Sequence, residues 1–243
     1  MGEVINLPQL LYAMRDNKDE HIKFFGHCLA YKEYSKSQNF QDVWALYEKP
    51  DNYPGFFVEF GATNGVDGSN SHMLHKKHGW YGIVAEPNPL WHNDLKKNRE
   101  DHKCKVVTDC VYTKTGETLE FLATDEPDLS TIKGFGRDDE HEAKRNNANT
   151  IKVKTISLHD LLYTNDAPVI IDYLSIDTEG SEYDILKSFF EDETNKFKIR
   201  CITVEHNYNQ QSRENLYNLL TSKGYRRKFE GFSRWDDFYI KDL

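Results

Sequence analysis

The stretch FFVEFGATNG at residues 56–65 decides the fold of this chain. Its first five residues are apolar except for Glu59, which is typical of a central parallel strand buried on both faces. Gly61 and Gly65 follow, and glycine accepts tight backbone turns and lets the backbone approach a ligand. The stretch therefore predicts a buried strand that breaks into a glycine turn at one edge of a sheet.

A second strand that ends on a carboxylate strengthens this interpretation. Residues 80–85 are predicted to form a strand, and Glu86 stands at its carboxyl end. A carboxylate there can accept hydrogen bonds from both hydroxyls of a ribose, as in Rossmann-like nucleotide sites. The dinucleotide fingerprint G-x-G-x-x-G is absent, because only Gly61 and Gly65 stand in this loop. The spacing favours S-adenosylmethionine (SAM), which has no pyrophosphate, over NAD.

Composition limits the classes of function. The chain has 243 residues and a formal net charge of −9, so it is long enough for one α/β domain and is acidic rather than basic. The acidic balance speaks against a nucleic-acid partner. No apolar run is long enough to cross a bilayer, and the N-terminus shows no secretory signal. The four cysteines include no C-x-x-C pair. We therefore expect a cytoplasmic protein with reduced thiols.

Strands and helices alternate along most of the chain, which predicts a doubly wound α/β sheet. Residues 1–36 are predicted to form a helical extension, and residues 37–243 to form the main domain, which ends in an antiparallel strand pair. The polar stretch 124–150 is interpreted equally well as a loop on the acceptor side of a site or as a surface insertion. The expected strands are 56–60, 80–85, 104–108, 117–123, 151–155, 169–176, 200–205, 225–229 and 235–240.

Acidic residues follow several of the predicted strands. Ligands of doubly wound sheets bind beyond the carboxyl ends of the strands. Packing alone requires no carboxylate at a strand end, so we expect these side chains to line one polar pocket. The residues are Glu59, Glu86, Asp109, Asp177 and the pair Glu205-His206.

Several motifs, taken together, resemble the FkbM family of SAM-dependent methyltransferases, and the resemblance runs from about residue 37 to 208. It implies a class I methyltransferase fold, a Rossmann-like doubly wound sheet with an antiparallel strand near its end. It also implies O-methylation of a hydroxyl on a sugar, a sugar nucleotide, a glycan or another small-molecule acceptor. The motifs are SQ at 37–38, QD at 41–42, FVEFGA at 57–62 with Gly65, DGSNS at 67–71, GWYG at 79–82, EPNP at 86–89 and SIDTEGSE at 175–182.

The resemblance further implies which residues bind SAM. Glu59, Gly61 and Gly65 would surround its methionine part, while Glu86 would hold the ribose. Thr63 departs from the pattern of many methyltransferases, which have glycine in this loop. The other implied cofactor residues are Gln38 and Asp42 closing over the cofactor, Ala62 and Asn70 in the loop, Pro87 after the ribose carboxylate, Asp109 and Cys110 beside the adenine, and Asp177 at the methionine end or the reaction centre.

A sugar hydroxyl is a poor nucleophile, so transfer to it calls for a general base. His206 is favoured because an ordinary histidine pKa of about 6.5 suits proton transfer near neutral pH. Asp177, Glu179 and His72 are the other candidates for this role. A purely structural role for His206 is an equally good interpretation.

Three alternatives stay open at this point. Asp177, Glu205 and His206 could together bind Mg²⁺ and so lower the pKa of the acceptor hydroxyl. Against this, the acidic residues at 179–182 also suit the N-terminus of a helix, whose dipole favours negative charge. The chain could instead be an NAD-dependent oxidoreductase, or a catalytically silent SAM-fold protein that acts as an interaction module.

Overall fold

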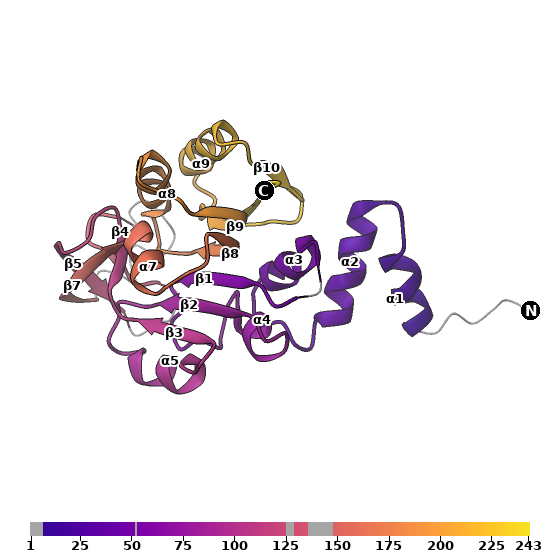
Figure 1. Cartoon of the computed structure of the whole chain (residues 1–243), viewed down its shortest axis with the longest axis horizontal. Helices are drawn as coiled ribbons and strands as arrows, with labels where there is room; N and C mark the ends of the chain where they lie inside the picture. The colour runs from indigo at the N-terminus through magenta and orange to yellow at the C-terminus, as the bar shows by residue number, and fades with distance from the viewer. Residues whose placement is uncertain (1–6, 52, 125–128, 136–147) are drawn as a thin grey trace, which may run out of the picture.

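The computed structural model describes residues 7–51, 53–124, 129–135 and 148–243 (Figure 1). A large sheet forms the centre of the protein, with a smaller sheet on one side and the first two helices on the other (Figure 1). The strands of the large sheet are β1 (Phe56–Phe60), β2 (Tyr81–Ala85), β3 (Cys104–Val107), β8 (Ile170–Ile176), β9 (Lys198–Glu205), β10 (Arg226–Lys228) and β11 (Asp236–Ile240).

The large sheet has seven strands in the order β10-β11-β9-β8-β1-β2-β3. β11 pairs antiparallel with β9 and β10, and the other neighbouring strands are parallel. The carboxyl ends of the parallel strands therefore meet at one edge, which is where such sheets bind ligands. The predicted fold class, a doubly wound α/β sheet with an antiparallel C-terminal strand pair, is confirmed.

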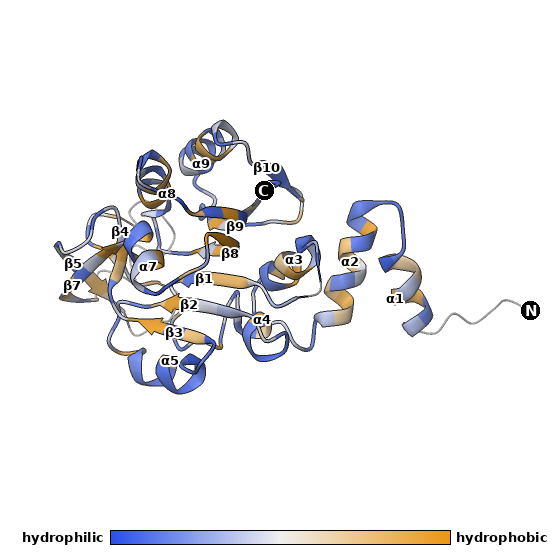
Figure 2. Cartoon of the chain, in the orientation of Figure 1, coloured by the Kyte–Doolittle hydropathy of each residue, from blue (hydrophilic) through white to orange (hydrophobic). Residues whose placement is uncertain are grey.

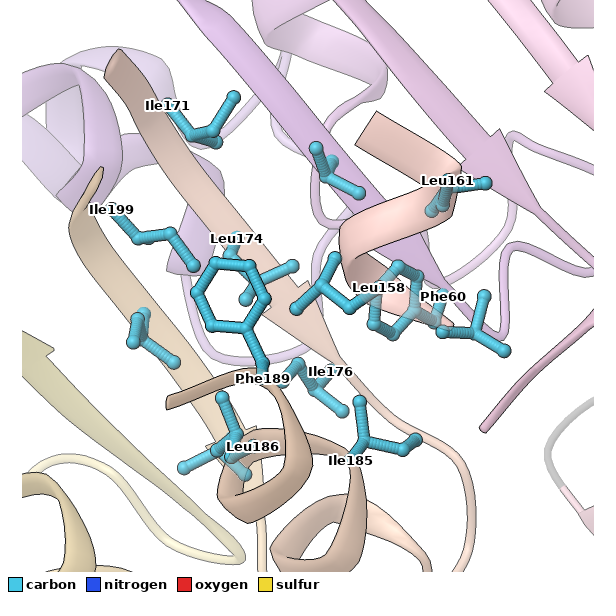
Figure 3. Packing of buried hydrophobic residues seen from close by; sticks show 14 of the residues in the cluster. Phe60, Leu158, Leu161, Ile171, Leu174, Ile176, Ile185, Leu186, Phe189 and Ile199 are labelled. Atoms are coloured by element: carbon cyan, nitrogen blue, oxygen red, sulfur yellow. The ribbon is translucent and has the colours of Figure 1, made fainter. Parts of the chain in front are cut away.

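Helices cover both faces of the large sheet, whereas the first helix, α1 (Leu7–Arg15), packs against α2. The covering helices are α2 (Glu20–Tyr31), α3 (Gln41–Glu48), α4 (His72–Lys76), α5 (His92–Arg99), α7 (Leu158–Thr164), α8 (Glu182–Glu191) and α9 (Gln210–Ser222). Successive side chains of a strand point to opposite faces. Val58 and Phe60 of β1 accordingly pack with α7, α8 and α9, whereas Phe57 packs with α2, α3, α4 and α5. Figure 3 shows Leu158 and Phe189 from two of the helices lying against the first of these faces.

The smaller sheet has four strands and follows β3 in the chain. Its strands are β4 (Cys110–Tyr112), β5 (Thr118–Ala123), β6 (Thr131–Ile132) and β7 (Asn149–Ser157), in the order β4-β7-β5-β6. The predicted pairing of the strand at 117–123 with the strand at 151–155 is confirmed. Within the predicted acceptor-side stretch 124–150, residues 125–128 and 136–147 lie outside the described residues.

Two helices occupy the predicted extension over residues 1–36. α2 buries Phe24 and Cys28, and the Phe24 ring stacks on Phe229 with centroids 4.6 Å apart. α1 buries none of its residues. The boundary at residue 37 stays a prediction. Among the described residues, no helix has the length and apolar character needed to cross a membrane.

The one acidic residue of β1 is buried in the layer of α4 and α5. Glu59 is 3% exposed, and its Oε2 accepts hydrogen bonds from Ser69 Oγ at 3.0 Å and Ser71 Oγ at 2.5 Å. Its Oε1 accepts a hydrogen bond from the backbone N–H of Asn70 at 2.6 Å. Arg99 Nη1 donates to the same carboxylate at 3.4 Å. Glu59 therefore fixes the loop that connects β1 to α4.

Arg99 is fully buried and ties this loop to α5. Its Nη1 also donates to the Gly65 carbonyl at 3.1 Å, and its Nη2 donates to Ser71 Oγ at 2.8 Å. A desolvated guanidinium needs such partners, because burying an unpaired charge is expensive. α5 is mostly hydrophilic (Figure 2), and Leu95 and Arg99 are its buried residues. Leu95 and the ion pair of Arg99 are thus the buried contacts of α5, and Asn98 Nδ2 adds a hydrogen bond to the Asn64 carbonyl at 2.9 Å.

We predict that Arg99→Met destabilises the protein by about 3–5 kcal/mol, because it leaves the Glu59 carboxylate buried without its positive partner. Urea unfolding at pH 7 measures this change. Lys97→Met, at an exposed position of the same helix, should change stability by no more than about 0.5 kcal/mol. Equal stability of the two variants would contradict the role given to Arg99.

Candidate active site

A pocket opens at the carboxyl edge of the parallel strands, which is where sheets of this kind bind ligands. Its walls come from the loops after β1, β2 and β8 and from the smaller sheet. The lining residues are Phe60, Gly61, Thr63, Ala85, Glu86, Pro87, Cys110, Val111, Phe121, Ser130, Ile132, Asp177, Thr178, Glu179 and Ser181.

The pocket brings together part of the cofactor set expected from the sequence. Gly61, Glu86, Pro87, Cys110 and Asp177 all line it. They come from the ends of β1, β2 and β8 and from the start of β4, so segments that are distant in sequence meet there. Of the strand-end residues expected to line one polar pocket, two do so, Glu86 and Asp177. The others are not among its lining residues, namely Glu59, Asp109, Glu205 and His206.

Other residues of the predicted cofactor set shape the loop from beneath and do not line the pocket. Glu59 is engaged by the loop and by Arg99. Gly65 has φ +78°, and an added Cβ would lie 2.5 Å from Arg99 Cγ. Asn70 Nδ2 donates to Ser175 Oγ at 3.0 Å. The absence of a side chain at Gly65 therefore serves packing on α5.

The remaining residues of that set also lie outside the lining of the pocket. Asp42 is buried and accepts hydrogen bonds from two serine hydroxyls at 2.6 and 2.7 Å. Burial raises the pKa of Asp42 to about 6. Gln38 is exposed, Ala62 is buried, and Asp109 is partly exposed. For these residues the geometry gives no direct support to the predicted contact with SAM.

Gly61 allows the ends of β1 and β8 to pack closely. Its φ is +69°, and an added Cβ would lie only 2.1 Å from the carbonyl oxygen of Asp177. Gly68, in the same loop, has the same φ of +69° but no atom within 4 Å of an added Cβ. Backbone conformation and steric contact can therefore be separated by substitutions at these positions.

Glu86 is 4% exposed and presents its carboxylate to the pocket. Its Oε2 accepts a hydrogen bond from the N–H of Thr63 at 3.0 Å, and its Oε1 accepts one from the N–H of Asn88 at 2.7 Å. Thr63 adopts φ +45°, a left-handed conformation that costs a non-glycine residue about 1–2 kcal/mol. Each carboxylate oxygen keeps a further lone pair for a ligand hydroxyl. Burial raises the pKa of Glu86 to about 7.

A cluster of carboxyl groups lies beside this pocket, formed by Asp177, Glu179 and Glu205. One oxygen of each lies within 4.8 Å of the others. Asn207 Nδ2 donates to Glu179 Oε2 at 2.8 Å and to Glu205 Oε2 at 3.1 Å. Burial and the adjacent carboxylates raise the pKa values of Asp177 and Glu205 well above their usual range. Both causes disfavour the ionised forms of these two carboxyl groups, and a bound cation would favour them.

His206 does not join the carboxyl cluster. Its Nδ1 accepts a hydrogen bond from the N–H of Tyr208 at 3.2 Å, which places the proton of the neutral ring on Nε2. Nε2 faces Asp237 Oδ1 at 3.9 Å, and Arg213 donates to that same carboxylate. Both ring nitrogens are thus directed at the protein, and His206 is 3% exposed.

The geometry does not bring His206 to the position that either of its predicted roles requires. The residues whose ligand atoms lie together are Asp177, Glu179 and Glu205, whereas the predicted metal set was Asp177, Glu205 and His206. Among the predicted candidates for the general base, Asp177 and Glu179 line the pocket and His206 does not, and the roles of these residues stay predictions. His72, the other histidine candidate, does not line the pocket, and burial lowers its pKa to about 4.

Some residues of the site were not singled out from the sequence. Phe121 and Ile132 line the pocket from the smaller sheet, and Ser130 lines it from the stretch 124–150. The stretch connects the predicted strands at 117–123 and 151–155, and this position was the only indication in the sequence that its residues reach the pocket. Asn207 directly follows the Glu205-His206 pair, yet its bridging contact depends on a turn that the sequence does not specify. Arg99 stands four residues after Leu95, on the buried side of α5.

Comparison with known domain families decides the identity of the chain. The family described as the methyltransferase FkbM domain matches residues 59–227. The chain belongs to the FkbM family of SAM-dependent methyltransferases. An FkbM methyltransferase from Methylobacillus flagellatus has a similar fold, with a TM-score of 0.50 and 12% sequence identity over 97% of this chain and 58% of that one.

Other solved structures match at lower TM-scores. The N-terminal domain of human METTL16 gives a TM-score of 0.43 and 15% identity over 96% of this chain and 79% of that one. An O-methyltransferase from Bacillus cereus in complex with SAH gives a TM-score of 0.43 and 11% identity over 94% of this chain and 93% of that one. No curated protein matches the chain. The FkbM assignment confirms the resemblance found in the sequence, and none of these matches favours an NAD-dependent oxidoreductase.

We predict that Gly61→Ala weakens binding of S-adenosylhomocysteine (SAH), the demethylated product of SAM, at least about tenfold. The added Cβ must displace the end of β8, which adds about 1–3 kcal/mol of overpacking. Gly68→Ala, which has the same backbone strain without the contact, should lose only about 1–2 kcal/mol of stability and keep its affinity for SAH. Calorimetric titration and urea unfolding of both variants measure these effects. Similar losses in both would show that the contact with Asp177 is unimportant.

We also predict that the affinity for SAH rises with pH. Ribose hydroxyls donate to the ionised form of Glu86, and its raised pKa keeps this carboxyl partly protonated below about pH 7. The dissociation constant should therefore fall by up to about tenfold per pH unit between pH 5.5 and 7 and then level off. Calorimetry across this range tests the expectation. Glu86→Gln should bind weakly with a flat profile, and a pH-dependent profile in this variant would assign the effect to another group.

Proposed function

We propose that this FkbM methyltransferase transfers the methyl group of SAM to a hydroxyl of a sugar, a sugar nucleotide, a glycan or a comparable small-molecule acceptor. One observation carries the proposal: Glu86, at the end of β2, and Asp177, at the end of β8, line the same pocket. The first is placed to bind a ribose. The second belongs to the carboxyl cluster, which can accept a proton.

The pocket residues fit SAM group by group. Cys110, Phe121 and Ile132 provide an apolar wall for the adenine, and Glu86 offers free lone pairs to the ribose hydroxyls. The carboxylate of Asp177 suits the positively charged methionine end. We propose this orientation of the cofactor in the pocket.

The proposed reaction is an in-line displacement at carbon. SAM supplies an electrophilic methyl group, whose bond to sulfur breaks, with its electron pair left on sulfur, as the acceptor oxygen forms its bond to carbon. The hydroxyl proton passes to a carboxylate of the carboxyl cluster. Asp177 and Glu179 are suited to this role because they line the pocket, and the raised pKa of Asp177 makes its carboxylate a stronger base. Alignment by the pocket walls can contribute about 7–11 kcal/mol.

A divalent cation such as Mg²⁺ is a second proposal for the carboxyl cluster. Carboxylate and amide oxygens are the ligands that Mg²⁺ prefers. Asp177, Glu179 and Glu205 offer such oxygens, and rotation of the Asn207 amide would add its Oδ1. A bound cation would hold the cluster ionised. Titration with MgCl₂ in the presence of SAH, and methyl transfer with and without a chelator, would test this proposal.

We further propose a cytoplasmic location. Cys28, Cys104, Cys110 and Cys201 are all buried, and none forms a disulfide. Burial raises the pKa of each thiol, so these cysteines stay protonated and unreactive. Such thiols suit a reducing compartment.

Methyl transfer tests the proposed function directly. The protein is incubated with SAM carrying a ¹³C-labelled methyl group and a panel of sugars, sugar nucleotides and phenols, and NMR detects new O–¹³CH₃ signals. Asp177→Asn should lower the turnover by about 10²–10⁴-fold, because the asparagine keeps the shape of the side chain but removes the carboxylate that accepts the proton. Its affinity for SAH should fall less than about tenfold, a difference of about 1.4 kcal/mol. Asp94→Asn, an exposed change on α5, should have no effect.

The outcomes separate the alternatives. SAH binding without transfer to any hydroxyl would favour the silent interaction module. Binding of NAD in place of SAH would restore the oxidoreductase hypothesis. Full turnover by Asp177→Asn would show that Asp177 is not the proton acceptor and would assign this role to another residue of the carboxyl cluster.

A further inference from the structure

A second pocket lies at the edge of the large sheet where the parallel strands begin, and we call it the amino-edge pocket. Pro54 and Trp80 line it from the segments that lead into β1 and β2, and further lining residues come from α2, α3 and the end of α1. The candidate active site lies at the other ends of the same strands. Figure 1 shows α1 and α2 on the side of the protein away from the smaller sheet. The two pockets are therefore separate sites.

Aromatic rings form much of the wall of the amino-edge pocket. Tyr31 and Tyr47 line it from α2 and α3. Trp80 is 2% exposed, whereas Tyr53 is 78% exposed, so one ring lies deep and the other stands in solvent. Gly55 makes room for the indole, because an added Cβ would lie only 2.8 Å from atoms of the Trp80 ring. Such rings offer flat faces on which a planar ligand can stack.

The pocket also carries an excess of positive charge in an acidic protein. Arg15 and Lys49 line it together with one carboxylate, Asp51. Lys49 Nζ lies 2.5 Å from Asp51 Oδ1 and 4.0 Å from Asp172 Oδ1, so the charge of this lysine is compensated. Within the described part of the chain, Arg15 forms no ion pair. Because the whole chain has a formal net charge of −9, a local excess of cation points to an anionic ligand.

Close packing of α1 on α2 brings Arg15 to this pocket. Gly26 of α2 permits the approach, since an added Cβ there would lie 2.8 Å from Met14 Cβ and 3.1 Å from Arg15 Cγ. α1 buries none of its own residues, so the hydrophobic core does not require this helix. A role of Arg15 in the pocket accounts for its position.

Two histidines complete the polar lining. His27 Nδ1 donates to the carbonyl of Lys23 at 2.9 Å, which leaves Nε2 of the neutral ring as a hydrogen-bond acceptor. Burial lowers the pKa values of His27 and His78, and nearby cations lower them further, Arg15 and Lys23 at the first ring and Lys77 at the second. The same positive surroundings that disfavour a protonated imidazole favour a bound anion.

We propose that the amino-edge pocket is a second ligand site and that it binds a nucleoside phosphate. The base would stack on the tyrosine rings, as bases do on exposed aromatic side chains. The phosphate would bind the guanidinium of Arg15, whose N–H groups match phosphate oxygens in pairs. His27 Nε2 can accept a hydrogen bond from a ribose hydroxyl or a base amino group. Methyl transfer takes place at the other edge of the sheet, so this ligand is an effector and not the methyl acceptor.

The combination of rings and charge excludes simpler ligands. An inorganic anion would pair with Arg15 but leave the aromatic wall unused. A neutral aromatic compound would cover the rings but leave the guanidinium unmatched. A quaternary ammonium ion, which aromatic rings also attract, would be repelled by Arg15 and Lys49. A nucleoside phosphate supplies both a planar ring and an anion.

Saturation-transfer NMR with AMP, GMP and UMP tests the proposal, with excess SAH present to occupy the candidate active site. At least one nucleotide should receive saturation from the protein. Arg15→Gln and Tyr53→Ala should each lower its affinity about tenfold, because they remove the phosphate donor and a stacking ring. Tyr53→Phe should retain the affinity. The matched controls are Lys18→Gln and Tyr12→Ala, which remove an exposed charge and a 73% exposed ring outside the pocket and should have no effect.

SAH calorimetry on the same samples keeps this test separate from that of the proposed function. Unchanged SAH affinity in Arg15→Gln and Tyr53→Ala shows that these variants are folded and that the loss concerns the second site. A nucleotide signal that disappears when SAH is added belongs to the candidate active site and overturns the inference. Inorganic phosphate that binds as tightly as the nucleotides overturns the nucleoside class. Absence of saturation for all three nucleotides also overturns the inference and leaves the proposed function intact.

Discussion

A buried ion pair between Glu59 of β1 and Arg99 of α5 holds the ligand edge of the sheet in shape. The carboxylate binds the loop after β1 from beneath, and the guanidinium joins the same loop through the Gly65 carbonyl. Breaking such a pair leaves an uncompensated buried charge, so its loss destabilises both the loop after β1 and the packing of α5. The pocket wall at Gly61 and Thr63 thus depends on two charged groups that lie outside the lining of the pocket. This explains why an otherwise apolar strand carries an acid.

The architecture was predictable because buried parallel strands leave a strong pattern. The apolar runs at β1, β2, β8 and β9 predicted the strands to within a few residues, and the alternation with helices predicted the doubly wound sheet. Glu86 was predictable for a further reason. It directly follows a parallel strand, and the carboxyl ends of the parallel strands all lie at the ligand-binding edge of such a sheet. The motifs that resemble the FkbM family then predicted a SAM-dependent methyltransferase.

The orientations of individual side chains were not predictable from the sequence. Glu59 stands one residue before the end of β1, and the alternation of the strand turns it into the helix layer. His206 faces Asp237 because the N–H of Tyr208 occupies its other nitrogen. Glu179 reaches the carboxyl cluster from a turn with φ +58°, a conformation that its sequence does not demand. In each case contacts made by segments distant in the chain, or the local pleat, decide where the acid or base points.

The raised pKa values of Asp177 and Glu205 bear on product release in the proposed reaction. Methyl transfer would convert a sulfonium cation into a neutral thioether beside Asp177, and the acceptor would release a proton to the carboxyl cluster. The cluster would then carry less negative charge and would face a molecule without charge on sulfur. The electrostatic attraction between the pocket and the bound molecule would therefore weaken in the same step that forms the product.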